Sequence, residues 1–479
     1  MIERLTADSR RCAPGVAFFA YPGEASDGRR YIADALERGA AAVLWEAEGF
    51  SWDSGWRVPN VAVSGLKAQA GVLAHEFYGR PTESLWVCGV TGTNGKTSCS
   101  QWIAALLGRQ GMKTAVIGTL GSGFPGALGA ERNTTPDALE THARLAQFLR
   151  EGAQGVAMEA SSHGLAQGRL NGVRFDCALF TNLSQDHLDY HGTLEAYGEA
   201  KARLFDAPGL AAAVLNLDDV VGVRLAQRLA ARGIRTIGYA LSQAAIAPGS
   251  VTEYIAAREI RPDSGGSLVS LVSSWGPLEV RINQPGRFNV ANALGVLGCL
   301  IVRGLPYTDA APLLSALPSL PGRMQRLGGD RQPLVFIDYA HTPDALEKVL
   351  LALRPLADAR GGNLVAVFGA GGDRDPGKRA PMGAAASRHA DRLVLTSDNP
   401  RNEDPLAILA QVRSGVTAPC RVEADRAAAI ETAVHLAGMS DVVLIAGKGH
   451  ETVQEIAGRV LPFSDAAIAA AALGRWSGA

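Results

Sequence analysis

The segment VTGTNGKTSC, residues 90–99, constrains the fold more than any other part of the chain, because it places a glycine-rich loop between a strand and a helix. Residues 85–90, LWVCGV, form an apolar run that predicts a buried strand. Residues 98–111 carry apolar side chains at helical spacing. A strand, a glycine-rich loop and a helix in this order form the phosphate-binding unit of parallel α/β sheets.

The residues within this loop match the chemistry of a bound nucleotide. Gly92 and Gly95 allow close approach of the backbone, so that amide groups and the start of the helix face an anion. Lys96 can reach the β- and γ-phosphates, and the Thr97 hydroxyl can bind Mg²⁺. The general pattern has a glycine where this chain has Val90, and the alternative is a glycine turn with a surface lysine. The flanking strand and helix favour phosphate binding.

The rest of the chain repeats the alternation of short apolar runs and helical patterns, which is typical of βα units and parallel sheets. Two segments rich in Gly and Pro, 78–84 and 317–325, interrupt the alternation. The sequence therefore predicts three α/β domains, residues 1–83, 84–320 and 321–479. Strands are expected in the segments 15–23, 41–46, 115–120, 155–161, 177–184, 212–219, 334–340, 363–372, 392–400 and 441–449.

Charge and hydropathy exclude some classes of partner. The chain has 46 basic and 47 acidic residues, whereas nucleic-acid-binding proteins usually carry a basic excess. Residues 1–12 lack the apolar segment of a signal peptide, and no apolar run approaches the ~20 residues that span a bilayer. We expect a cytoplasmic protein that binds no nucleic acid and does not insert into membranes.

The cysteines give no sign of a metal site. None of them forms a C-x-x-C pair, which argues against zinc and indicates free thiols in a reducing compartment. They are Cys12, Cys88, Cys99, Cys177, Cys299 and Cys420.

Polar side chains follow two of the predicted strands of the second domain. Glu159 and His163 come just after one apolar run, and Asp186 and His187 follow the next. Ligand sites in parallel sheets collect beyond the carboxyl ends of the strands. Glu159 fits a second Mg²⁺ ligand beside the phosphate loop, and His187 fits a second cation or a phosphate. Taken singly, each residue could be a capped turn or a satisfied histidine, and the helical pattern around Lys201 predicts a solvated lysine.

Nine motifs occur in the order found in Mur ligases, and the chain resembles this family over almost its whole length. The motifs are VTGTNGKT, NTTPDAL, MEASSHGL, TNLSQDHLDYHG, GRFNVANAL, PGRMQ, DYAHTPDAL, GAGGDRDPGKR and GKGHE. The resemblance implies a UDP-binding N-terminal domain, a central phosphate-loop ATPase with a mostly parallel sheet, and a C-terminal Rossmann-like domain. It also implies an ATP-dependent ligase of peptidoglycan precursor synthesis that uses Mg²⁺.

The resemblance assigns roles to individual residues. The catalytic residues and metal ligands would be Thr97, Glu159, His187 and Lys201, with Lys96 at the phosphates and Lys201 carried as a carbamate (N6-carboxylysine). ATP would contact Thr91, Gly92, Thr93, Asn94, Gly95, Lys96, Thr97, Asn289, Asn292, Arg323, Asp338, Tyr339 and His341. The UDP-linked substrate would contact Ser9, Glu24, Ala25, Ser26, Asn133, Thr134, Thr135, Ser162, Gln167 and Arg169.

The amine substrate is predicted from the segment SDNPR. Arg401 follows the turn formers Asn399 and Pro400 at a strand end, and its guanidinium suits a carboxylate unless it pairs with Glu403 or Asp404 instead. In the resemblance, D-N-P-R marks enzymes that add meso-diaminopimelate to UDP-N-acetylmuramoyl-L-alanyl-D-glutamate through an acyl phosphate. The diaminopimelate-binding residues would be Arg374, Asp398, Asn399, Pro400, Arg401, Gly447 and Glu451.

Two positions depart from the family pattern, and other functions stay open. Gln325 stands where a glutamate is common, and Ala370 where a cysteine is often found. The alternatives are a lysine-adding Mur ligase, a folylpolyglutamate-type ligase, a nucleotide-dependent switch or motor, and a non-catalytic UDP-sugar binder. We expect a monomer.

Overall fold

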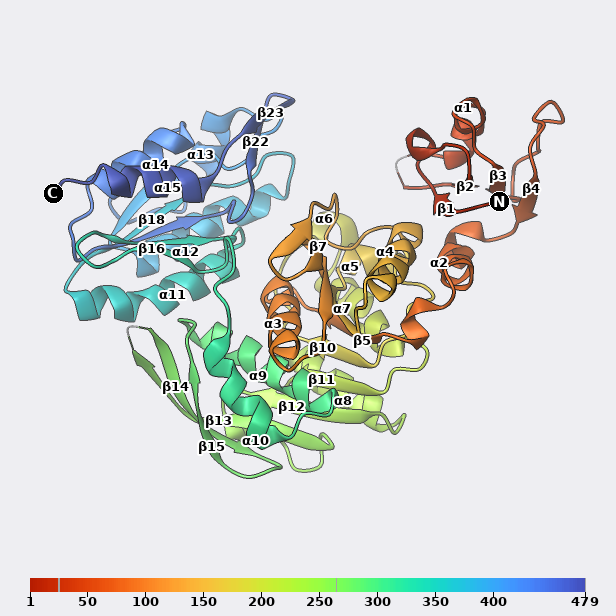
Figure 1. The fold of residues 1–479 in the computed structure, drawn as a ribbon. Helices are drawn as coiled ribbons and strands as arrows, with labels where there is room; N and C mark the ends of the chain where they lie inside the picture. The colour runs from red at the N-terminus through yellow and green to blue at the C-terminus, as the bar shows by residue number, and fades with distance from the viewer. Residues whose placement is uncertain (25, 264, 479) are drawn as a thin grey trace.

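The computed structural model describes residues 1–24, 26–263 and 265–478, and it contains three separate α/β units (Figure 1). The N-terminal unit and the C-terminal unit lie at opposite sides above the central one. The fold predicted from the sequence, three α/β units with a mostly parallel central sheet, is confirmed. Among the helices of the described residues, none combines the length and the apolar character needed to cross a membrane.

The N-terminal unit is a four-stranded parallel sheet in the order β1-β2-β3-β4. One face packs on α1 (Ile32–Glu37), which follows directly on a 3₁₀ turn, Gly28–Tyr31. The other face packs on α2 (Leu66–Phe77), which leads towards the central unit. The strands are β1 (Arg4–Thr6), β2 (Val16–Ala20), β3 (Ala42–Glu46) and β4 (Asn60–Val63).

The central unit is built on an eleven-stranded sheet in the order β15-β14-β13-β12-β11-β10-β5-β9-β6-β7-β8. The strands from β13 to β6 in this order are parallel, and both edges are antiparallel. The strands are β5 (Trp86–Thr91), β6 (Thr114–Gly118), β7 (Gly121–Phe124), β8 (Ala127–Gly129), β9 (Gly155–Glu159), β10 (Cys177–Phe180), β11 (Ala212–Asn216), β12 (Arg235–Ala240), β13 (Glu253–Asp263), β14 (Gly266–Ser273) and β15 (Leu278–Ile282).

Helices cover both faces of the central sheet, so that its strands are apolar on both sides. On one face, α3 (Lys96–Arg109) and α9 (Arg287–Val302) pack against alternate residues of β5 and β10. On the other face lie α4 (Ala138–Arg150) and α8 (Val220–Ala230). The shorter helices are α5 (Ser162–Ala166), α6 (Leu188–His191), α7 (Leu194–Ala202) and α10 (Tyr307–Ala310).

The C-terminal unit is a six-stranded sheet in the order β16-β17-β21-β18-β19-β20, antiparallel only at β16. One face packs on α11 (Pro343–Arg360), α12 (Arg379–His389) and α13 (Pro405–Arg413), and the other on α14 (Arg426–His435) and α15 (Asp465–Gly474). Its strands are β16 (Gln325–Gly328), β17 (Leu334–Asp338), β18 (Leu364–Phe368), β19 (Arg392–Leu395), β20 (Cys420–Val422) and β21 (Val442–Ala446), and a separate hairpin joins β22 (Val453–Ile456) to β23 (Arg459–Pro462).

All ten strand segments expected outside the phosphate loop unit contain a strand. The sequence did not predict β1, β4, β12, β16, β20, the hairpin of β22 and β23 or the antiparallel edges of the central sheet. Most of these strands are short, exposed or polar, whereas β12 is buried but carries Arg, Thr and Gly that interrupt its apolar run. The two boundaries between the three predicted domains stay predictions. The 3₁₀ turn Pro81–Glu83 lies in the first predicted linker, and the second predicted linker leads into β16.

Candidate active site

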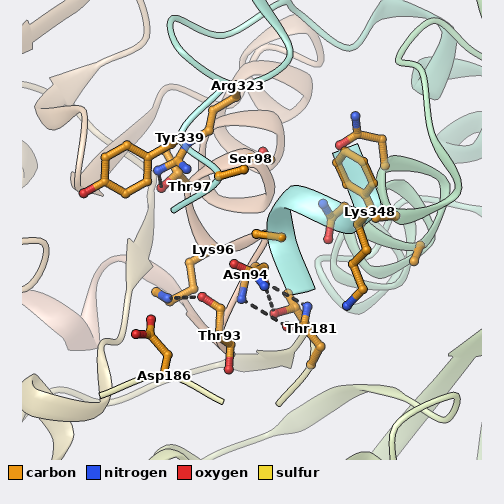
Figure 2. A pocket seen from close by; sticks show the side chains of 18 of the residues that line it. Thr93, Asn94, Lys96, Thr97, Ser98, Thr181, Asp186, Arg323, Tyr339 and Lys348 are labelled. Atoms are coloured by element: carbon orange, nitrogen blue, oxygen red, sulfur yellow. Dashed lines mark hydrogen bonds between the residues drawn. The ribbon is translucent and has the colours of Figure 1, made fainter. Parts of the chain in front are cut away.

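A cavity of about 790 Å³ lies where the central and C-terminal units meet, and the phosphate loop forms part of its wall (Figure 2). Arg323 of the C-terminal side approaches Thr97 from opposite Lys96 and Asp186. The sequence-predicted residues that line the cavity are Thr93, Asn94, Gly95, Lys96, Thr97, Asn133, Thr134, Thr135, Glu159, Arg169, His187, Asn289, Asn292, Arg323, Asp338, Tyr339 and His341.

The phosphate loop is held in shape by the strand beside it. The Thr181 hydroxyl donates to the carbonyl of Asn94 at 2.6 Å, and the Asn94 amide donates to the Asn182 side chain at 3.0 Å. Gly92 has φ +143°, and a Cβ there would lie 1.9 Å from the Thr181 hydroxyl. The loop therefore needs glycine at this position for steric reasons as well as for its backbone conformation.

Lys96 points back along the loop. Its ammonium donates to the carbonyls of Gly92 and Thr93, each at 2.9 Å, and the removal of the side chain from water lowers its pKa. Thr91 is placed differently from the other loop residues, because its hydroxyl donates to the carbonyl of Ala160 at 2.8 Å. Thr91 thus joins β5 to the end of β9, and it does not line the cavity.

Glu159 lies at the end of β9, and its carboxylate accepts three hydrogen bonds. The hydroxyls of Thr97 and Thr119 donate to Oε2 at 3.1 and 3.0 Å, and the Thr119 amide donates to Oε1 at 2.8 Å. Glu159 is 1% exposed, so this carboxylate is fixed in a largely dry wall of the cavity. Arg323 donates to the same Thr97 hydroxyl at 3.1 Å, which brings the C-terminal unit into contact with the Thr97–Glu159 pair.

Asp186 and His187 follow β10. Asp186 lies near Lys96, on the side of the cavity away from Arg323. His187 has φ +52°, and its Nε2 lies 3.4 Å from a carboxylate oxygen of Asp186. Burial lowers the pKa of His187 to about 4, so its imidazole is neutral at pH 7 and has a lone pair available for a ligand. For Asp186, burial acts to raise the pKa, but the neighbouring side chains of His341, His187 and Lys378, with the hydrogen bond that the His187 amide donates, lower it overall.

Lys201 is not a solvated lysine, so the interpretation from helical spacing alone was wrong. The residue is 1% exposed, its amine lies 2.8 Å from the Gly92 carbonyl, and the nitrogen sits 4.1 Å from the centre of the Tyr197 ring. Burial, with Lys96 nearby, lowers its pKa well below the usual value. The side chain thus reaches the back of the phosphate loop as a readily neutralised amine.

Helix α9 forms the far wall of the cavity with Asn289 and Asn292. Asn289 donates to the Pro285 carbonyl at 2.8 Å. Gly95 packs on Asn292, and a Cβ on this glycine would lie 2.4 Å from the amide oxygen. The contact with Asn292 therefore excludes any side chain at position 95, as the contact with Thr181 does at position 92.

The C-terminal unit contributes the segment after β17. The amides of Met324 and Ala340 donate to the two oxygens of Asp338 at 2.8 and 2.9 Å, and burial raises the pKa of this carboxyl. The guanidinium of Arg323 lies 4.5 Å from the centre of the Tyr339 ring. The backbone turn set by Asp338 therefore orders the side chains that face the phosphate loop.

Residues predicted to hold the UDP-linked substrate lie partly in the cavity and partly at the junction with the N-terminal unit. Arg169 donates to the Thr135 carbonyl at 2.8 Å and to the Gln167 side chain at 2.8 Å. Gln167 in turn donates to Glu24 at 2.7 Å across the junction. Ser162 is buried at the start of α5, Ser9 is buried in the N-terminal unit, Ser26 is exposed, and Ala25 lies outside the described residues.

Arg401 lies outside the main cavity, on the C-terminal unit. It has φ +51°, and its guanidinium donates to the Gly372 carbonyl at 2.7 Å and lies 3.4 Å from Glu455. It does not pair with Glu403 or Asp404, which were the local alternatives: Glu403 binds Arg379, and Asp404 caps α13.

Arg374 is exposed, and it lines a second cavity of about 520 Å³ with residues such as Gln185 and Asp189 of the central unit. A Cβ at Gly371 would lie 3.6 Å from the side chain of Arg374 and 3.1 Å from that of Arg401. The two arginines therefore flank one glycine at the edge of the C-terminal unit.

Sequence reasoning missed Lys448, which joins two of the predicted motifs. Its ammonium, 0% exposed, donates to Asn399 Oδ1 at 2.9 Å and to Glu451 Oε2 at 2.7 Å. Asn399 also donates to Glu451 Oε2 at 2.8 Å. The signal in the sequence is a lysine between Gly447 and Gly449, both at positive φ, directly after a buried strand.

Two buried arginines that were also missed hold the loops around this network. Arg426 pairs with Asp465 at 2.8 Å, both 0% exposed, and donates to the carbonyls of Ser397 and Ala446. Arg379 bonds both oxygens of Glu403 at 2.8 Å and the Gly371 carbonyl at 3.1 Å. Hydrogen bonds from these two buried arginines thus hold the loops that carry Asp398 and Arg401.

The two departures from the family pattern have structural explanations. The Gln325 side-chain oxygen accepts from the Gly322 amide at 2.8 Å, a bond that a carboxylate oxygen could make equally well. Ala370 is buried in the apolar core of the C-terminal unit, where a methyl group fits.

Comparisons with known proteins agree with the geometry. Three family descriptions match the chain: Mur ligase family, catalytic domain, over residues 1–78; Mur ligase middle domain over 90–300; and Mur ligase, glutamate ligase domain, over 322–449. The chain is 51% identical to a UDP-N-acetylmuramoyl-L-alanyl-D-glutamate–2,6-diaminopimelate ligase of Janthinobacterium sp. (strain Marseille), over 98% of this chain and 94% of the relative.

Solved structures also match the chain over most of its length. A structure of a ligase of that name matches with a TM-score of 0.68 and 37% identity, over 99% of this chain and 95% of the other. A folylpolyglutamate synthase of Mycobacterium tuberculosis has a TM-score of 0.64 at 20% identity, over 80% of this chain and 92% of the other, which shows a shared fold alone.

Proposed function

The chain belongs to the Mur ligase family of ATP-dependent ligases, and we propose that it adds meso-diaminopimelate to UDP-N-acetylmuramoyl-L-alanyl-D-glutamate in peptidoglycan precursor synthesis. ATP is the co-substrate and ADP and inorganic phosphate are the products. The reaction takes place in the cytoplasm, where ATP and UDP-linked precursors are available, and the enzyme works as a monomer.

One observation carries the proposal: a single cavity is lined by the phosphate loop, by Asn133 and Arg169 from the sugar-side motifs, and by Arg323 and His341 from the C-terminal unit. A nucleotide switch needs the first of these groups, and a UDP-sugar binder needs the second. A ligase needs all of them, because the acid, the γ-phosphate and the amine must meet at one point.

The residues around Glu159 fit Mg²⁺, because a buried carboxylate and the hydroxyl of Thr97 offer hard oxygen ligands 3.1 Å apart beside the phosphate loop. Glu159 and Thr97 would hold one ion, and His187 with carbamylated Lys201 would serve a second. When bound, Mg²⁺ supplies positive charge next to the transferred phosphoryl group.

Lys201 has the surroundings that a carbamate needs before it forms. Its lowered pKa favours the neutral amine, which adds to the carbon of CO₂ and releases one proton. The product is an anion, and the neighbouring Lys96 charge that opposes an ammonium at this position would stabilise a carbamate there.

The proposed reaction has two steps. A carboxylate of the UDP-linked substrate attacks the γ-phosphorus of ATP, and Lys96 and Arg323 neutralise charge on the transferred group. The acyl phosphate then has a good leaving group. The amine attacks its carbonyl carbon, a tetrahedral intermediate forms, and phosphate leaves as the amide is made.

The choice of amine would rest on the C-terminal unit. Arg401 would pair with the distal carboxylate of diaminopimelate, a group that lysine lacks, and Arg374 would lie beside it. Glu451 Oε2 already receives Lys448 and Asn399, so its Oε1 is the oxygen left to accept a substrate ammonium. The distal carboxylate would give the partly exposed Arg401 guanidinium a charge-assisted bond that lysine cannot supply, so lysine would bind more weakly.

The test is to incubate the purified protein with the UDP-linked dipeptide, ATP and either meso-diaminopimelate or lysine, and to identify products by mass. We expect the diaminopimelate product, formed with one ADP for each amide, and no amide from Lys96→Ala although it still binds the UDP-linked substrate. Faster use of lysine would refute the substrate assignment. ATP turnover that needs no acceptor would favour the nucleotide switch.

A further inference from the structure

Three cysteines that are far apart in the sequence meet in the core of the central unit. Cys88 lies on β5, Cys177 on the neighbouring β10, and Cys299 on α9. The register pairs Cys177 with Cys88, so the two side chains point to the same face of the sheet, the face that α9 covers. Cys299 Sγ lies 3.9 Å from Cys88 Sγ and 3.8 Å from Cys177 Sγ, and all three sulfurs lie within 4.8 Å of one another.

This cysteine trio, Cys88, Cys177 and Cys299, is sealed from solvent, since each residue is 0% exposed. Its surroundings in the core are apolar side chains such as Leu179 and Val214. Within the described residues, no further His, Cys, Asp or Glu side chain joins the group. Cysteine often serves as a small apolar residue in cores, but three sulfurs already within 4.8 Å of one another are also a preformed set of soft ligands.

Charge decides which element such a site can hold. Three thiolates around Zn²⁺ leave a net charge of −1 and an open fourth position, and three around Cu⁺ leave −2. An uncompensated charge is expensive in an apolar core. A trivalent centre with three thiolates is neutral and needs no fourth ligand, so it adds no charge to the core.

We propose that the cysteine trio is a binding site for trivalent arsenic or antimony, taken up as the neutral hydroxide. Three As–S bonds form while three As–O and three S–H bonds break. Each departing hydroxide leaves with one thiol proton as water, so three waters are released. The element stays trivalent, and no oxidant or reductant takes part.

The cysteine trio would link β5, β10 and α9, and these elements position the nucleotide site although the trio itself lies outside the cavity. β5 leads into the phosphate loop and α9 carries Asn289 and Asn292. Because the folded state already holds the three sulfurs within 4.8 Å of one another, binding stabilises that state against unfolding. Access requires a local opening of α9 from the sheet, so uptake is slow compared with that of exposed thiols.

The test uses the full chain, kept reduced, and prolonged incubation with sodium arsenite under native conditions, followed by native mass spectrometry and arsenic X-ray absorption. We expect one adduct per chain with the mass of one arsenic less three hydrogens, three sulfur neighbours and no oxygen, and a higher unfolding temperature. Cys299→Ala, Cys88→Ala and Cys177→Ala lose this adduct and the temperature rise, whereas Cys99→Ala, also buried but outside the trio, keeps both.

Three results would overturn the proposal. They are the absence of an adduct on the folded chain when the same chain in denaturant gains one, an identical adduct in Cys299→Ala, and a centre with two sulfurs and an oxygen in the wild type. None of these readouts depends on ligase activity, so the outcome is separate from the proposed function.

Discussion

Replacing Lys448 by methionine removes the cation that joins the D-N-P-R turn to Glu451, while it keeps most of the side-chain volume. The ammonium gives up two contacts, 2.9 Å to Asn399 and 2.7 Å to Glu451. Breaking a buried ion pair costs about 3–5 kcal/mol. Since the Glu451 side chain is 27% exposed and water can compensate in part, we expect the free energy of unfolding to fall by about 2–3 kcal/mol.

The effect on catalysis follows from the same contacts. Without Lys448, the Asn399 amide and the Glu451 carboxylate can rotate, so the oxygen offered to the substrate ammonium is no longer fixed. We expect the KM for diaminopimelate to rise about 10- to 100-fold, equivalent to about 1.4–2.7 kcal/mol. The KM values for ATP and the UDP-linked substrate stay within about twofold, because their predicted contacts do not involve this network.

Steady-state kinetics with each substrate varied in turn, and denaturant unfolding, measure the two effects separately. Lys113→Met is the control, because Lys113 is an exposed lysine of the central unit that bonds the Glu151 carbonyl. A lower apparent kcat with all three KM values unchanged would mean that Lys448 acts only through stability. An unchanged KM for diaminopimelate would refute the positioning role outright.

Three further predictions concern selectivity, modification and pH. Arg401→Ala lowers the ratio of kcat/KM for diaminopimelate over lysine by roughly 10²-fold, since each lost charge-assisted hydrogen bond is worth about 1.5–3 kcal/mol; an unchanged ratio would remove Arg401 from the selector role. Wild-type protein under ¹³CO₂ shows a carbamate carbon by NMR that is absent in Lys201→Ala, and the variant loses most ligase activity; a signal of equal size in both would place the carbamate elsewhere. Burial lowers the pKa of His142 to about 4 from a reference value of 6.5, so the unfolded chain takes up the proton first as pH falls. Stability contributed by the neutral form is complete above pH 6.5 and is lost between pH 6.5 and 4, by about 3 kcal/mol. Unfolding of His142→Gln shows a correspondingly flatter pH dependence, and an identical slope in both proteins would contradict this.

Most strands of the parallel sheets could be predicted because burial on both faces leaves continuous apolar runs, whereas the parallel strands β1, β4, β12 and β20 were missed. β5, with the glycine-rich loop and α3 after it, is the clearest case. The antiparallel edge β13 to β15 could not be predicted, because alternate polar residues on half-exposed strands give a weaker pattern. The phosphate loop was predictable for a further reason: its glycines touch Thr181 and Asn292, contacts that no other residue type allows.

Some residues of the candidate site could also be predicted from the sequence, and others could not. Glu159 and His187 follow apolar runs, so their place at strand ends could be read from spacing. Lys201 could not, because its helix has no strong apolar stripe and only the fold shows that its amine reaches Gly92. The contacts of Lys448 with Asn399, and of Arg426 with Asp465, join segments 49 and 39 residues apart, and sequence spacing carries no information about such pairs.

The central claim is that ATP activates the substrate carboxylate as an acyl phosphate, and oxygen transfer tests it most directly. The UDP-linked dipeptide is prepared with ¹⁸O in its reacting carboxylate and converted with ATP and diaminopimelate. The account predicts that each released phosphate carries one ¹⁸O, because the carboxylate oxygen that attacked phosphorus leaves with it. Phosphate without ¹⁸O, formed alongside a normal yield of amide, would contradict the account.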